Sequence, residues 1–330
     1  MRATLAAVAL LLSADPLTWT EGTPLPVGRD HHVTFLVEAP LGGALVYVAG
    51  GNTYQGVLAD VWRAAIGTGG VLGGWTAGDS LPGGRAGHSV AVTDRAVIVT
   101  GGKLADRKNT TATLAAAVAP DGTLGPWRPT TPLPTPRFHH ATVAATGHVY
   151  VLGGLEENTS VASVYAASIT PDGVGEWRAQ TALPRPRSHH AAFVHDGALW
   201  VVAGLDGNPA GANTPLADVL RAPIGADGSL GAWTEVSRLD SALAVFAAVV
   251  HGGFVYVLGG VENNARFVNT VQRAPIEGGR LGAWQRLAAG LPTARAHVHQ
   301  TPVYRGRVYS VGGSASRQVT TAVHIGTFGP

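Results

Sequence analysis

The chain contains no cysteine and few charged residues. Without cysteine it has no disulfide bonds, no thiolate metal ligands and no cysteine nucleophile. Charged residues make up 13% of the chain and the formal net charge is only +2, with no basic run or stripe. We therefore expect no nucleic-acid partner, because binding to phosphates needs clustered positive charge.

Glycine and proline are abundant instead, with 45 glycines and 21 prolines among 330 residues. They recur at fixed places between apolar runs, so they indicate turns rather than disorder. Hydrophobic residues make up 45% of the chain, which is enough to build a large core. The composition predicts a globular domain with many turns.

The N-terminal residues differ from the rest of the chain. One positive charge and ten apolar residues precede Ser13-Ala14. This pattern predicts a secretory signal peptide over residues 1–14, although Leu12 stands where a small residue is usual. The alternative is an apolar segment that packs on the domain. The run is too short to span a bilayer, so we expect a secreted or periplasmic protein with no transmembrane segment and one domain over residues 15–330.

A unit of about 50 residues recurs along the chain. A tryptophan marks each of six copies: Trp19, Trp75, Trp127, Trp177, Trp233 and Trp284. Ten or eleven residues later, five copies have an arginine: Arg29, Arg85, Arg137, Arg187 and Arg295. A Leu-Pro pair precedes each arginine, and an apolar run ending in Gly-Gly follows it in four of these copies. The copy after Trp233 departs, because Leu243 and Phe246 replace the arginine and a histidine.

Each unit predicts four short strands. In one copy they are residues 140–144, 148–154 and 161–169, followed by a strand that carries the tryptophan. Asp-Gly turns before the fourth strand favour a hairpin. A glycine pair weakens a strand, so we expect it where another group approaches closely. We expect the tryptophan of a neighbouring strand to fill that space.

The pattern Leu-Pro-x-x-Arg-x-x-His, apolar strand, Gly-Gly and Trp resembles the kelch repeat, from Trp19 to about Ile325. The resemblance implies an all-β fold, namely a six-bladed kelch-type β-propeller with four antiparallel strands per blade. The chain begins on a tryptophan strand and ends after a third strand at 319–325. We therefore expect the N-terminal strand around Trp19 to complete the last blade and close the ring, in a monomer.

Two histidine series follow the arginines. The first histidine series stands three residues after them, where the family has a structural histidine: His32, His88, His140 and His190. The second histidine series stands two residues after them: His31, His139, His189 and His297. Neighbouring strand residues face opposite ways, so the second series is a candidate cluster at the central channel. Such a cluster can bind a transition metal or a ligand. The alternative is duplication of one His-His pair with the repeat.

The arginines allow two interpretations. Guanidinium groups at the rim of the blades would bind an anionic sugar or a peptide carboxylate, which makes Arg29, Arg85, Arg137, Arg187 and Arg295 candidate ligand-binding residues. The alternative is that each arginine donates to carbonyls of an adjoining loop. Polar loops after the glycine pairs, such as residues 52–55 and 103–109, form the other candidate binding surface.

Fold alone does not decide function. We favour a secreted, non-catalytic protein that binds a glycan or protein partner through its loop face, without a cofactor. The alternative is a sugar-modifying enzyme of the mutarotase or polysaccharide lyase type. In that case His139, His189, Arg137 and Arg187 are the candidate catalytic residues. A transition metal would then be held by the second histidine series.

Overall fold

The computed structural model describes residues 17–207, 213–298, 300–316 and 318–329. The predicted signal peptide, residues 1–14, lies outside these ranges. The described chain is built of β-strands, with one short 3₁₀ helix, η1, at Thr68–Gly70. Within those ranges no helix has the length and apolar character needed to cross a bilayer.

The described strands form six larger sheets of four or five antiparallel strands. Five of them are each built from strands of one stretch of the chain, with short hairpin strands between some of them. These are β2 (Val33–Glu38), β3 (Ala44–Ala49), β6 (Val61–Ala65) and β7 (Thr76–Gly78); β9 (Ser89–Val92), β10 (Ala96–Thr100), β12 (Thr113–Ala117) and β13 (Arg128–Thr130); β14 (Ala141–Ala145), β15 (His148–Leu152), β18 (Val164–Thr170), β19 (Gly173–Val174) and β20 (Arg178–Ala179); β21 (Ala191–His195), β22 (Ala198–Gly207), β23 (Asn213–Pro223) and β24 (Thr234–Arg238); and β26 (Ala247–His251), β27 (Phe254–Leu258), β30 (Val271–Glu277), β31 (Arg280–Leu281) and β32 (Gln285–Arg286).

The sixth larger sheet joins the two ends of the chain. It contains β33 (Val303–Tyr304), β34 (Arg307–Val311), β37 (Val323–Thr327) and, at its edge, β1 (Thr18–Glu21). Trp19 lies opposite Gly326, and Glu21 lies opposite His324. A side chain at position 326 would collide with the indole of Trp19, which explains a glycine in the middle of this strand. The third strand of this unit begins at Val323 rather than at Val319, which belongs to a separate hairpin.

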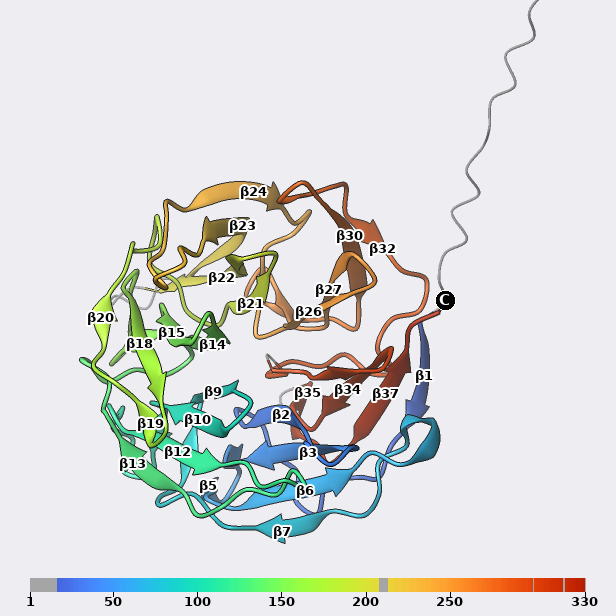
Figure 1. Ribbon diagram of the computed structural model, residues 1–330. Coiled ribbons are helices and arrows are strands. Elements are labelled where there is room, and N and C mark those ends of the chain that lie inside the picture. The colour runs from blue at the N-terminus through green and yellow to red at the C-terminus, as the bar shows by residue number, and fades with distance from the viewer. Residues whose placement is uncertain (1–16, 208–212, 299, 317, 330) are drawn as a thin grey trace, which may run out of the picture.

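Figure 1 shows these sheets arranged around a common centre, with β2, β9, β14, β21 and β26 nearest to it and β7, β13 and β24 at the outside. The all-β structure fits a β-propeller. The second strand of each sheet is almost fully buried because it has a neighbouring sheet on both faces. One core cluster, for example, packs Ile98 of β10 against Val151 of β15.

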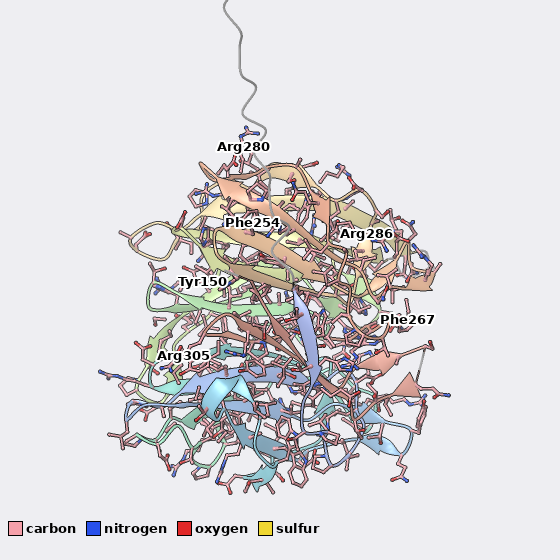
Figure 2. All side chains as sticks on the ribbon, turned by 90° about the vertical axis from the view of Figure 1, so that its right-hand side faces the viewer. Tyr150, Phe254, Phe267, Arg280, Arg286 and Arg305 are labelled. Carbon is pink, nitrogen blue, oxygen red and sulfur yellow. The ribbon has the colours of Figure 1, made fainter. Side chains whose placement is uncertain are left out.

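Short two- and three-stranded pairings follow the second strand of most units and gather on one side of the molecule, which we call the hairpin face. Their strands are β4 (Asn52–Thr53), β5 (Gly56–Val57), β8 (Arg85–Ala86), β11 (Lys103–Leu104), β16 (Leu155–Glu156), β17 (Thr159–Ser160), β25 (Leu243–Ala244), β28 (Val261–Glu262), β29 (Arg266–Phe267), β35 (Ser314–Ala315) and β36 (Gln318–Val319). In two of these pairings the partner strand, β8 or β25, precedes the first strand of its unit. In the edge-on view of Figure 2, Phe267 of such a hairpin lies at one rim. Arg305, in the turn between β33 and β34, lies at the opposite rim.

Candidate functional site

The five repeat arginines are buried, with exposed fractions of 0–3%. Each donates a hydrogen bond to a main-chain carbonyl, as Arg29 does to Gly50 at 3.0 Å and Arg137 does to Gly153 at 2.9 Å. The remaining pairs are Arg85 with Gly101, Arg187 with Ala203, and Arg295 with Ala322. This geometry favours the structural interpretation of the arginines over a role in ligand binding or catalysis.

Acidic partners differ among these arginines. Arg29 pairs with Asp60 at 2.7 Å, Arg137 with Glu156 at 3.1 Å, and Arg187 with Asp218 at 2.7 Å. Among the described residues, Arg85 and Arg295 have no ion pair, and burial lowers the pKa of each to about 10. The shared contact of the five guanidinium groups is therefore a main-chain carbonyl, and a carboxylate assists in three of the units.

The first histidine series fills the space that the glycine pairs leave open. A side chain at Gly50 would lie 2.8 Å from the ring of His88, and one at Gly101 would lie 2.9 Å from the ring of His140. The prediction that a neighbouring tryptophan occupies this space is wrong. The indoles lie further out, where Trp75 donates to the carbonyl of Thr23 in the preceding repeat copy.

The residue two positions after each repeat arginine, or after Leu243 in the unit that lacks one, has a left-handed backbone. Its φ lies between 52° and 61° in all six units: His31, Gly87, His139, His189, Val245 and His297. Hydrogen bonds of 2.7–3.0 Å run from the N–H of each later residue in this set to the carbonyl of the one before it. This conformation costs least for glycine and most for a β-branched residue. The second histidine series is therefore displayed by a strained backbone that links neighbouring units.

The structure brings the four rings of the second histidine series together. The ring centroids of His31 and His297 lie 3.8 Å apart, and those of His139 and His189 also lie 3.8 Å apart. His31 and His139 join the two pairs at 5.0 Å. These residues come from four units, so the cluster sits where the units meet. Whether it binds a ligand or a metal stays a prediction.

Polar side chains hold three of these rings. Nδ1 of His31 lies 2.6 Å from Asp30, Nδ1 of His189 lies 2.9 Å from Ser188, and Nδ1 of His297 lies 3.1 Å from Ser314. Ser314 in turn donates to Asp30 at 2.5 Å. Burial by itself would raise the pKa of Asp30, but hydrogen bonds and charge interaction with His31 hold it below the usual value. Asp30 is therefore a carboxylate at neutral pH.

A pocket of about 860 Å³ opens on the hairpin face beside this cluster. His31 and His139 line it together with Phe138, Tyr54, Lys103 and Arg107. The ammonium group of Lys103 lies 4.1 Å from the centre of the Phe138 ring, a cation–π contact. Burial and, to a lesser extent, the nearby Arg107 lower the pKa of Lys103. None of the described residues that line this pocket is acidic, so it has a cationic character.

A comparison with protein families agrees with the repeated geometry. The family model described as the KLHDC2/KLHL20/DRC7 Kelch-repeats domain matches residues 74–260. This chain belongs to the kelch-repeat family. No curated protein matches it. The kelch match covers more than half of the chain and includes the Lys103 and His139 sides of the pocket.

Sequence reasoning named part of the lining of this pocket. The loop 103–109 and the second histidine series were predicted, and two of those histidines line the pocket. Phe138 and Ser314 were missed. Both stand beside motif residues, directly after Arg137 and directly after Gly312-Gly313, so their positions in the repeat were the available signal. Their contacts come from different units and leave no local pattern.

Proposed function

We propose that this protein is a non-catalytic kelch propeller that binds an acidic segment of a partner protein on its hairpin face. Kelch domains mediate protein interactions. The observation that carries the proposal is the 860 Å³ pocket, in which Lys103 and Arg107 stand without an acidic residue among the described lining. A carboxylate that enters this pocket would contact the two cations, Lys103 and Arg107, in a partly desolvated environment, where charge-assisted hydrogen bonds are strong.

The pocket also has features that suit a glycan, which is the second candidate partner. Tyr54 lines it and is 74% exposed, so its ring offers a flat surface to a sugar. A glycan that carries carboxylates would use the same cations. The alternative of a sugar-modifying enzyme draws on the short contact of 2.6 Å between Asp30 and His31, an arrangement that can orient a general base.

Removal of one pocket cation at a time tests the binding proposal. We expect Lys103→Gln and Arg107→Gln each to weaken binding of an acidic peptide by about tenfold to hundredfold, because each loses a charge-assisted contact. The measurement is calorimetric titration with a glutamate-rich peptide, a neutral peptide of equal length and polygalacturonate. Assays of product formation with the polysaccharide test the enzyme alternative.

Lys108→Gln is the matched control for this experiment. It removes the same charge from the same loop, but Lys108 is not among the residues that line the pocket, and it lies 3.9 Å from Asp106. We expect the affinity of this variant for the acidic peptide to stay within about twofold of that of the unaltered protein, because exposed charges are screened. An equal loss of affinity in all three variants would show a general electrostatic attraction rather than a binding site, and would contradict the proposal. Tighter binding of polygalacturonate than of the acidic peptide would favour the glycan.

We further propose that the six larger sheets are six blades and that β1 closes the ring as the outer strand of the last blade. The support is the antiparallel register of β1 and β37. The N–H of Gly313 in the last unit also donates to the carbonyl of Arg29 in the first unit at 2.9 Å. Closure leaves no unpaired sheet between the first and last units. We also propose that the protein is secreted or periplasmic and monomeric.

Cysteine pairs test the closing strand, because the chain has no thiol of its own. We expect Glu21→Cys with His324→Cys to form a disulfide on mild oxidation, since these residues are directly opposite in the register. Thr20→Cys with His324→Cys is the control, because Thr20 points to the other face of the strand and should not form one. Intact-mass measurement before and after reduction distinguishes them. Equal oxidation of both pairs would argue against the register.

A further inference from the structure

We propose that Asp30, His31 and His297 form a site for a divalent transition metal of the zinc class, which clamps the first repeat unit to the last. Each of the three residues offers one donor atom, and these atoms all lie within 4.8 Å of one another. The inference does not depend on the proposed binding of an acidic partner.

The donor set has the chemistry that such metals prefer. Two imidazole nitrogens and a carboxylate oxygen suit zinc, nickel and copper, whereas calcium and magnesium prefer oxygen ligands alone. Zinc binds such ligands at about 2.0–2.2 Å, which places neighbouring ligand atoms about 3.4 Å apart. The donor atoms of this cluster, which all lie within 4.8 Å of one another, would move closer together to reach that spacing. Three protein ligands leave one position for water or another ligand, and His31 also lines the pocket on the hairpin face.

Hydrogen bonds already hold the three donor residues around one point. Asp30 contacts Nδ1 of His31 at 2.6 Å and accepts a hydrogen bond from the hydroxyl of Ser314 at 2.5 Å. The same hydroxyl lies 3.1 Å from Nδ1 of His297. Partners of this kind orient metal ligands and are usually retained around metal sites. Ser314 is therefore a positioning residue for the carboxylate and for one imidazole.

The site spans the junction between the two ends of the repeat array. Asp30 and Ser314 are 284 residues apart in the sequence but in direct contact. The left-handed backbone at His31 and His297, with φ of 54° and 58°, brings both rings to the same place. A metal ion here would add a cross-link between the first and last units, and so would stabilise the folded state over the unfolded chain.

Metal titration of tag-free, chelator-treated full-length protein tests this proposal. We expect one equivalent of Zn²⁺ to bind with micromolar or tighter affinity and to raise the melting temperature. Co²⁺ should bind competitively and give visible absorption bands typical of low coordination number. Asp30→Asn and His297→Asn should each weaken Zn²⁺ binding at least tenfold. Asparagine is chosen at position 297 because it tolerates the left-handed backbone that this residue adopts.

His195→Asn is the matched control. His195 lies 3.4 Å from the carboxylate of Asp196, so it forms another His–Asp pair, but it is the last residue of β21 and is not part of the cluster. Its affinity for Zn²⁺ should stay within about twofold of the unaltered protein. The proposal is overturned if no saturable binding of Zn²⁺ or Co²⁺ occurs, or if Asp30→Asn and His297→Asn bind as tightly as the control. Because no peptide or glycan is present, this result is separate from the test of the pocket.

Discussion

Acidification from pH 6.5 to about pH 4.5 is expected to lower the free energy of unfolding by about 2 kcal/mol through His140 alone. Burial, and then the charge of Arg137, lower the pKa of His140 to about 3 in the folded protein. In the unfolded chain a histidine binds its proton near pH 6.5. Between these values only the unfolded state is protonated, so stability is present above pH 6.5 and is lost as the pH falls.

Other buried histidines act in the same direction. Burial lowers the pKa of His324 to about 4 and holds that of His88 well below its ordinary value. The combined effect of these histidines is the slope of the free energy of unfolding against pH, which denaturant unfolding at several pH values measures. We expect His140→Gln to reduce this slope by about one proton, or about 1.4 kcal/mol per pH unit, even though it lowers stability at pH 7.

Thr142→Val is the control for the acid experiment. Thr142 shares a hydrogen bond of 2.7 Å with Thr100, which also bonds His140, but Thr142 has no ionisable group. This variant should lose stability by a similar amount at every pH and keep the slope of the unaltered protein. If His140→Gln also kept that slope, His140 would be protonated in the folded protein and the expectation would fail.

Asp218→Ala is expected to lower the free energy of unfolding by about 3–5 kcal/mol, which is the second large effect. Asp218 accepts two hydrogen bonds from the fully buried Arg187, at 2.7 and 3.3 Å. Without the carboxylate, a buried guanidinium keeps its charge, and its remaining hydrogen-bond partner in the part of the chain that the structure describes is the carbonyl of Ala203. Urea unfolding monitored by tryptophan fluorescence provides the measurement.

Asp60→Ala is the matched comparison, because Asp60 makes the same pair with Arg29 in another unit. The side chain of Asp60 is 32% exposed, against 9% for that of Asp218, so water can take the place of the Asp60 carboxylate. We therefore expect Asp60→Ala to lower the free energy of unfolding by about 1–2 kcal/mol. A double change of Arg187→Met with Asp218→Leu should cost less than Asp218→Ala alone. If Asp218→Ala cost no more than Asp60→Ala, the carboxylate would not be the compensating charge for Arg187.

The repeated parts of the fold could be predicted because their signals are local. Apolar runs ending in Gly-Gly predicted the buried second strands, and β15 ends at Leu152, just before Gly153. The tryptophan register predicted the outer strands, and Trp75 and Trp233 each stand directly before one. The third strands were placed a few residues too early, because the hairpin at Val319 has the same apolar character as a strand.

The directions of the histidines could be predicted only in part. Alternation along a strand suggested that His31 and His32 point apart, and they do, but His31 precedes β2 and has a left-handed backbone. The prediction that a tryptophan lies against the glycine pairs was wrong because it also depended on how neighbouring units pack. The group that approaches Gly50 is His88 of the next unit, and contacts between units leave no trace within one repeat.

The sequence by itself determined the repeat, most of its strands and the positions of the repeated motif residues within each unit, because periodicity and turn chemistry act over a few neighbouring residues. The tertiary structure decided which residues of different units meet. Asp30 and Ser314 in the junction, and Lys103 over Phe138 in the pocket, are contacts between segments that only the ring of sheets brings together. Such contacts depend on how the sheets are arranged relative to one another, which no local pattern encodes.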